Sequence, residues 1–270
     1  MPSKPRPYVR QMPRIYGNLQ PTVRPGARWI GLGVRLGIVF GLAAYLLNLL
    51  FFGPLFRVRT VSVVGATFSS ADRVQASVPT GSNIWLVSAG EIRTQVLGDP
   101  AVRSVAVLRG LPHTVRVTVS EQPVAVIWQT GNALALINDG GEIFKLLPVS
   151  ALADSPLKDL RATVPLIVDS HNLPVVLGQD LLSPQFIAFS MAIQKNLTLN
   201  VSMLHPDRFS VVNSTYDVTL LTQEGPQVRL SSLNDPNVQL RNLARLMIAE
   251  KLPMNAQIDL RVNRWAYVHE

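Results

Sequence analysis

The residue types that carry most enzyme chemistry are sparse in this chain of 270 residues. It has no cysteine, which excludes thiol nucleophiles and cysteine-ligated zinc sites. It also has no nucleotide-binding P-loop, no zinc-protease motif and no serine-hydrolase elbow. The four histidines stand apart, without the spacing of metal ligands: His113, His171, His205 and His269. We therefore expect no catalytic residue, no metal and no cofactor.

A membrane-anchored hydrolase that uses a serine and a lysine is the enzyme class that these residues exclude least. The last 214 residues contain only four lysines, and each lies in a setting typical of a protein surface: Lys145, Lys158, Lys195 and Lys251. Sequence alone does not show which side chains meet in space. Binding chemistry fits the remaining residues better than catalysis does.

The C-terminal segment combines strand-forming residues with the side-chain types that are enriched at protein interfaces. A final strand at the edge of an open sheet presents unpaired N–H and C=O groups, so it can accept a strand of another chain. In the alternative interpretation, Leu260, Val262, Trp265 and Val268 are the last layer of the core. The candidate partner-binding residues are Asp259, Arg261, Val262, Arg264, Trp265 and Tyr267.

A second candidate interface lies in the long apolar segment near the N-terminus. Its small and polar residues recur three or four positions apart, which places them on one helical face: Gly33, Gly37, Gly41, Ala44 and Asn48. Small residues let membrane helices approach closely, and an asparagine can hydrogen-bond across the contact. The alternative is that glycine is simply frequent in membrane helices.

Charge and hydropathy locate the elements that must position these residues. Residues 1–35 contain seven basic residues and no acid, whereas the rest of the chain carries 18 basic and 17 acidic residues. The net charge of +8 therefore belongs mostly to a short tail, which argues against a nucleic-acid partner. Residues 36–56 are uncharged and long enough to cross a bilayer. Six prolines among the first 25 residues predict a disordered tail.

We interpret residues 36–56 as an uncleaved signal anchor. A buried core helix is normally shorter, and a cleaved signal peptide would have a shorter basic lead-in and a small-residue cleavage site. The basic residues that flank the span are balanced, so the fully basic tail decides the orientation. We expect a single-pass type II protein of the plasma membrane, with residues 57–270 outside. The tail is either a simple topology signal or a docking segment for a cytoplasmic partner.

The outer region begins with a predicted β-α-α-β-β order. Strands are expected at 57–64, 102–108 and 114–120, the last with alternating valines directed inward. Serines at 69 or 70 and at 88 are candidate caps for the two helices.

The remaining residues predict a mixed β-domain with two packed helices. Ser183-Pro184 and Asp235-Pro236 are typical helix starts, and residues 148–163 read as a loop. Final strands are expected at 257–262 and 265–268. The complete organisation is a tail (1–35), a transmembrane helix (36–56), a first outer domain (57–123) and a β-domain (124–270), an α+β fold class.

In this order the motifs resemble the FtsQ/DivIB family of bacterial cell-division proteins, whose first outer domain is a POTRA domain. Two departures are that only one residue separates Glu121 from Pro123 and that Ser231 stands where a glycine is common. The matching motifs are Val61-x-Val63-x-Gly65, Gly81-x-Asn83-x-Trp85, Pro100-x-Val102, Arg109-x-Leu111-Pro112, Pro123-Val124-Ala125-x-x-Trp128, Val164-Pro165-Leu166-Ile167, Leu177-Gly178 and Ile258-Asp259-Leu260-Arg261.

The resemblance implies a non-enzymatic scaffold at the division septum. It implies that the C-terminal strands bind an FtsB/DivIC-like partner, which comes with an FtsL-like protein, by β-augmentation. Because POTRA domains likewise pair with strands of other proteins, the resemblance also implies that the strand 114–120 is a second candidate sheet edge. Other division membrane proteins are further candidate partners. The alternative is a POTRA-bearing component of protein secretion or outer-membrane assembly, although that class normally carries repeated POTRA domains or a long barrel.

Overall fold

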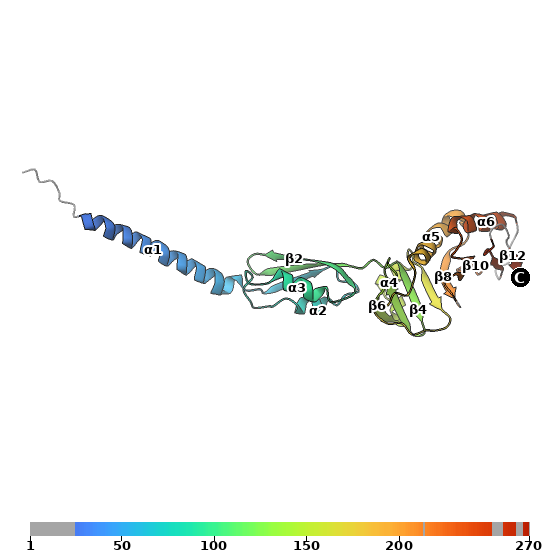
Figure 1. The fold of residues 1–270 in the computed structure, drawn as a ribbon, viewed down its shortest axis with the longest axis horizontal. Helices are drawn as coiled ribbons and strands as arrows, with labels where there is room; N and C mark the ends of the chain where they lie inside the picture. Colours follow the sequence, from blue (N-terminus) through green and yellow to red (C-terminus); the bar gives the residue numbers. More distant parts are fainter. Residues whose placement is uncertain (1–24, 213, 250–255, 263–266, 270) are drawn as a thin grey trace, which may run out of the picture. The chain divides into compact units, whose positions relative to one another are not determined.

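The computed structural model describes residues 25–212, 214–249, 256–262 and 267–269 (Figure 1). The chain divides into two compact units, Met1–Pro54 and Leu55–Glu270. The elements confirm a mixed α+β fold with an N-terminal apolar helix.

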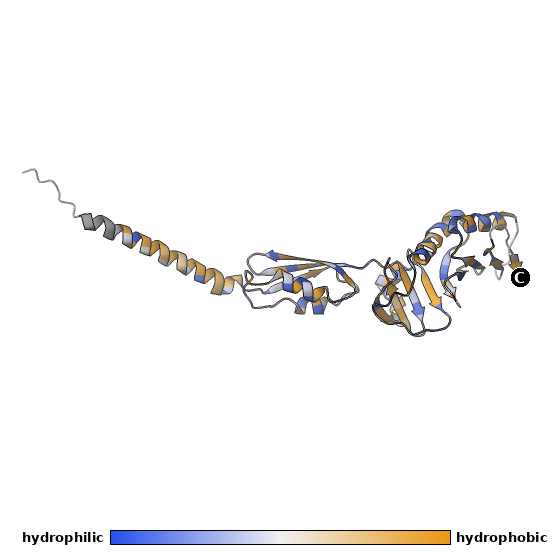
Figure 2. Ribbon diagram, in the orientation of Figure 1, coloured by the Kyte–Doolittle hydropathy of each residue, from blue (hydrophilic) through white to orange (hydrophobic). Residues whose placement is uncertain are grey.

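The first unit contains one long helix, α1, from Pro25 to Phe52. From Leu32 to Phe52 its large apolar side chains are exposed, except for the half-buried Leu50. Most of this stretch is hydrophobic, as its predominantly orange colour in Figure 2 shows. A soluble helix would bury such a surface against a core. The stretch Gly31–Phe56 is long and apolar enough to cross a membrane. The helix begins before the predicted span because its backbone continues through the basic residues that precede the apolar segment.

The POTRA region has the predicted β-α-α-β-β order. Its strands are β1 (Thr60–Val64), β2 (Val102–Gly110) and β3 (Thr114–Glu121), and its helices are α2 (Ala71–Ala76) and α3 (Ala89–Val96). The side chains of Ser70 and Ser88 accept hydrogen bonds from the backbone N–H groups three residues on, which confirms both caps. The two helices contribute Val74, Ile92 and Val96 to a core completed by the inward valines of β3.

The expectation that β3 is a sheet edge is wrong. The strand order is β1-β3-β2, so β3 lies in the centre. It pairs with β2 as an antiparallel hairpin and with β1 in parallel, from Thr60 opposite Thr114 to Val64 opposite Thr118. The alternating valines indicate which face of β3 is buried. They do not indicate which strands pair with β3 on its two sides. The open edges of this sheet are β1 and β2.

Glu121, the last residue of β3, fastens the loop that follows β1. Its carboxylate accepts hydrogen bonds from the N–H groups of Thr67, Phe68 and Ser69 at 2.6–2.9 Å, and from the Ser69 hydroxyl at 2.6 Å. Three successive N–H groups directed at one carboxylate form a compact anion-binding turn. These bonds fix the loop that follows β1 to the end of β3.

The C-terminal region is built on one nine-stranded sheet. The order across it is β12-β11-β10-β9-β8-β7-β4-β5-β6, so its two edges are β12 and β6. The strands are β4 (Val126–Thr130), β5 (Ala133–Ile137), β6 (Ile143–Pro148), β7 (Leu166–Asp169), β8 (Pro206–Val211), β9 (Asp217–Thr222), β10 (Gln227–Ser231), β11 (Gln257–Asp259) and β12 (Tyr267–His269).

Two hydrophobic clusters lie on opposite faces of this sheet. Successive residues of β4 show the division, because Val126 and Trp128 belong to one cluster and Ile127 to the other. Helices α5 (Pro184–Asn200) and α6 (Pro236–Ala249) pack against the first cluster, and Ser183 caps α5 as predicted. Asp235 accepts the N–H of Asn237 at the start of α6.

The segment 148–163 is not the simple loop that the sequence suggested. It forms a 3-10 turn, η2 (Val149–Ala153), and a short helix, α4 (Ser155–Leu160). Only Leu157 of α4 is buried, where it joins the second cluster. Six residues with one buried side chain give no helical periodicity, so sequence patterning could not reveal this helix.

Replacing Glu121 with Gln should loosen the β1–α2 loop. The amide loses the negative charge and one acceptor, so we expect a loss of about 2 kcal/mol in the local opening free energy. This corresponds to roughly thirtyfold faster amide hydrogen exchange at residues 67–69. Hydrogen-exchange mass spectrometry on the full chain measures this. The exposed Glu91→Gln is the control, and equal exchange in the two variants would contradict the role of Glu121.

Candidate partner-binding edge of the C-terminal sheet

The last two strands extend the sheet from β10 and form its C-terminal edge. β11 pairs in parallel with β10, and β12 pairs antiparallel with β11 through Ile258 opposite Val268. Both strands are shorter than predicted, at three residues each. Within the described part of the chain no further strand pairs with the outer side of β12. The edge therefore offers backbone groups to an added strand.

Arg261 ties this edge to the interior strands. Its guanidinium binds the Asp259 carboxylate through Nε at 3.0 Å and Nη2 at 2.7 Å, and reaches Asp217 at the start of β9 through Nη1 at 2.9 Å. The Arg261 carbonyl accepts the side-chain N–H of Asn234 at 2.7 Å. A fork of this kind fixes both distance and orientation. Arg261 thus links the end of β11, the start of β9 and the turn before α6.

The charges of this cluster favour its ionised state. Partial burial acts to raise the pKa of Asp259, but hydrogen bonds from the side chain and backbone of Arg261 outweigh it and lower that pKa. Hydrogen bonding to Asp259 raises the pKa of Arg261 further above its ordinary value, so this side chain stays protonated. The ion pairs are therefore intact at neutral pH.

The six predicted partner-binding residues fall into three groups. Asp259 and Arg261 are engaged with each other, so their role within the chain is to hold the edge in place. Val262 and Tyr267 are 52% and 54% exposed and are open to a partner. Arg264 and Trp265 lie outside the described residues. Two of the residues assigned to the alternative core layer, Leu260 and Val268, do pack against the main cluster.

The predicted packing face of α1 is open along its whole length. Gly33, Gly37 and Gly41 have space around them, since an added Cβ would meet no atom within 4 Å. Ala44 and Asn48 on the same face are exposed. Nothing in the described chain covers these five residues.

Catalytic groupings do not assemble in the described residues. No set of three or more His, Asp or Glu side chains there could hold a metal ion. His205 pairs with Glu224 at 2.6 Å on an exposed surface. Ser155 and Lys158 have the spacing of a serine–lysine pair on α4, a match that the sequence reading overlooked, but both are exposed.

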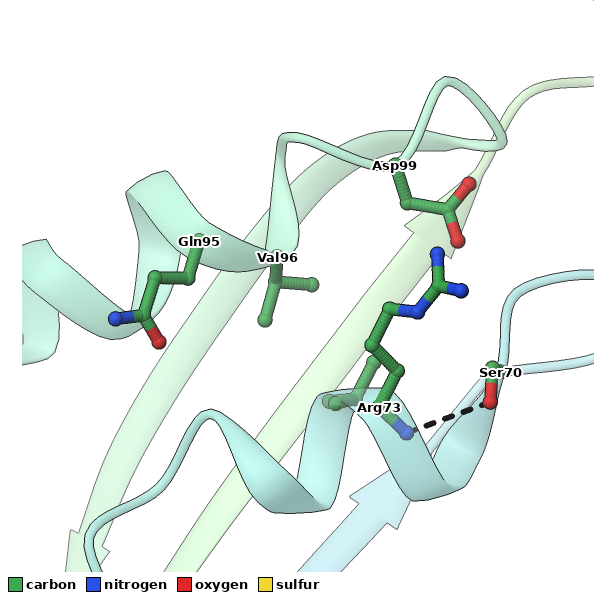
Figure 3. Close-up of a pocket in the computed structure, with 6 residues that line it drawn as sticks. Ser70, Arg73, Gln95, Val96 and Asp99 are labelled. Atoms are coloured by element: carbon green, nitrogen blue, oxygen red, sulfur yellow. Dashed lines mark hydrogen bonds between the residues drawn. The ribbon is translucent and has the colours of Figure 1, made fainter.

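Two pockets in the described chain also lack a grouping of side chains typical of an active site. One lies between α2 and α3, where the Arg73 side chain points toward Asp99 (Figure 3). Its volume is about 20 Å³, close to the space for one water molecule. The other, of about 210 Å³, lies between α5 and α6. No acid, base or histidine lines it; the residues are Asn200, Val201, Ser202, Met203, Ala244, Met247 and Ile248.

Replacing Arg261 with Gln should destabilise the edge by about 1 kcal/mol at pH 7, because the two partially exposed ion pairs are lost. The lowered pKa of Asp259 stabilises the native chain above the unfolded-state value of about 3.9, and this contribution disappears as the pH falls below it. The difference in the free energy of unfolding between wild type and R261Q should therefore be smaller at pH 3 than at pH 7. Urea titrations at both pH values measure it. The exposed Arg241→Gln is the control, and an equal loss in that variant would exclude a specific role.

Comparison with known proteins gives a consistent result for the two regions that follow α1. Residues 56–122 match the POTRA domain of FtsQ type, and residues 126–261 match the C-terminal region of the cell division protein FtsQ/DivIB. The second match alone covers half of the chain.

Curated relatives carry the same description. Cell division protein FtsQ of Chloroflexus aurantiacus is 35% identical over 64% of this chain and 63% of its own length. The FtsQ proteins of Chloroflexus aggregans and Myxococcus fulvus are 31% and 25% identical, over 52% and 80% of this chain and 48% and 73% of their own lengths. The chain thus spans about half to two-thirds of the first two relatives. On the combined match of its POTRA and C-terminal regions, the chain belongs to the FtsQ/DivIB family of cell division proteins.

Proposed function

We propose that this protein is a non-enzymatic, single-pass scaffold of the division machinery. It connects membrane and cytoplasmic components to an outer FtsB/DivIC–FtsL complex and so to septal wall synthesis. The observation that carries the proposal is a sheet whose final strand, β12, is left open and whose neighbouring strand, β11, is held in place by Arg261. The absence of a catalytic grouping among the described residues is compatible with it.

The proposed topology places residues 1–35 in the cytoplasm and residues 57–270 outside, at the division septum. The part of α1 that follows Arg35 is uncharged and largely exposed, which supports insertion as a single span. The seven basic residues and no acid before residue 36 support a cytoplasmic N-terminus. Domain boundaries near 57 and 124 fit the two separate sheets.

The proposed docking mode is β-augmentation at β12. An incoming strand gains main-chain hydrogen bonds along β12, and exposed side chains on this edge provide specificity. Tyr267 is the strongest anchor among the described residues, because a tyrosine buries a large apolar ring and retains a polar tip. Asp259 and Arg261 act as positioning residues, and Arg264 and Trp265 remain predictions.

A second contact is proposed along α1. The open face of Gly33, Gly37, Gly41, Ala44 and Asn48 lets the span of another division protein approach closely. An asparagine near the outer end can hydrogen-bond across such a contact. The alternative function in secretion or outer-membrane assembly has less support, because the β-domain matches the C-terminal region of a cell division protein family.

Depletion of the protein should stop septation while cell growth continues. Because a missing scaffold prevents assembly of the wall-synthesis complex, we expect filaments without septa. Fluorescence microscopy of membrane and nascent cell wall checks this, with re-expression of the full chain as the rescue control. Normal septation accompanied by loss of envelope proteins would contradict the division role.

Tyr267→Ala should weaken binding of the FtsB/DivIC-like partner about thirtyfold, which is the effect of removing an interface hot spot. A pull-down or titration with the purified partner measures it. Tyr216→Ala is a matched control, because Tyr216 is 59% exposed and lies away from the edge. Equal binding by the two variants, together with undiminished binding by Val262→Pro, would argue against the edge.

A further inference from the structure

One end of the POTRA domain is built around the segment that leaves α1. The N–H of Ile84 donates to the carbonyl of Phe56 at 2.7 Å, and the N–H of Val58 donates to Ser82 at 2.9 Å. The N–H of Arg59 donates to His113 at 2.9 Å. These bonds hold the α2–α3 loop and the β2–β3 turn beside residues 56–59. We call this set, residues 55–60, 80–88 and 108–114, the N-proximal end.

This end displays apolar side chains on a fixed backbone. Leu86 is 69% exposed and Leu111 is 57% exposed. Trp85 is partly exposed and its ring contacts Phe56 at a centroid distance of 6.0 Å. The N–H groups of Trp85 and Leu86 both donate to Asn83, at 2.9 Å. Exposed apolar residues held rigidly indicate an interaction surface.

The same end is purely basic. It contains Arg57, Arg59 and Arg109 and no acidic residue, although the POTRA region as a whole contains four acids. Arg57 and Arg109 are exposed, and Arg109 donates one hydrogen bond, from Nη2 to the Val87 carbonyl at 2.7 Å. Its other N–H groups can reach an anion. Glu121 and the start of α2 lie at the opposite end of the strands.

Covalent connection places this end near the membrane. Helix α1 ends at Phe52, and Phe56 follows four residues later. Four residues span at most about 14 Å, which is roughly twice the thickness of one headgroup region. Whatever the orientation of the POTRA domain, its N-proximal end therefore cannot leave the vicinity of the bilayer surface.

We propose that the N-proximal end binds the outer surface of the membrane through anionic phospholipids. Trp85, Leu86 and Leu111 enter the interface between headgroups and acyl chains, where tryptophan is favoured. Arg57, Arg59 and Arg109 pair with lipid phosphates. This contact orients the POTRA domain on the bilayer. The inference rests on α1 being a membrane span, and it is independent of the partner that binds at β12.

The chain has no cysteine, so single labels test the contact in the full-length protein. An environment-sensitive fluorophore is attached at Leu86→Cys, in nanodiscs of phosphatidylcholine with one-third phosphatidylglycerol. Lipids with a nitroxide near the headgroup are the quencher. Leu97→Cys is the matched control, because Leu97 is also exposed but lies at the far end of α3. We expect at least threefold stronger quenching at position 86.

A label at Leu46→Cys, within α1, reports separately on the anchor. If position 46 is quenched by acyl-chain nitroxides while positions 86 and 97 remain equally aqueous, the proposed contact is overturned and the span is retained. If position 46 is also aqueous, both are overturned, although the partner binding at Tyr267 would still be measurable.

The lipid chemistry is tested with the same label. Arg57→Gln combined with Arg109→Gln should reduce the affinity for the anionic surface, by roughly fivefold per charge, and quenching at position 86 should fall toward the level of position 97. Pure phosphatidylcholine or 0.5 M salt should have a similar effect, since screening weakens exposed charge pairs. Unchanged quenching under all three conditions would overturn the role of lipid phosphates.

Discussion

The parallel pairing of β11 with β10 is the constraint on which the C-terminal edge depends. Parallel neighbours cannot be joined by a hairpin, so the chain must cross the sheet between them, and α6 lies in this connection. The crossing brings the end of the chain to the outside of the sheet. Three residue pairs are a short ladder, and the fork of Arg261 onto Asp259 and Asp217 compensates for that shortness. The candidate binding edge is therefore a consequence of topology secured by one arginine.

A parallel strand pair also determines the arrangement of the POTRA sheet, but here it places a strand in the centre and not at the edge. Its parallel pair, β1 with β3, is also joined through helices, and this pairing buries the strand that looks most like an edge in the sequence. Glu121 then closes the far end of the domain by holding three N–H groups of one loop. The opposite end keeps its apolar and basic side chains exposed. The two ends are thus chemically distinct, which suits a domain tethered at one end to a membrane.

Sequence patterns predicted the structure correctly where the interactions join residues that are close in the chain. Ser70, Ser88 and Ser183 cap the predicted helices, because the capping bond joins residues three positions apart. The alternating valines of β3 correctly identified its buried face. Sequence patterns did not predict α4, because this helix is too short to show a helical periodicity. They also did not predict which strands lie beside β3. Pairing between strands distant in sequence leaves no trace in either strand alone.

The sequence by itself determined the long uncharged segment, most of the order of the elements and the family. These follow from composition and from spacings of a few residues. Only the tertiary structure decided that Asp259 and Arg261 hold the edge, while Tyr267 and Val262 are open to a partner. Only it brought Trp85, Leu111 and Arg57 to one end of the POTRA domain. The reason is that exposure and charge clustering depend on which distant segments pair, and pairing is a property of the whole sheet.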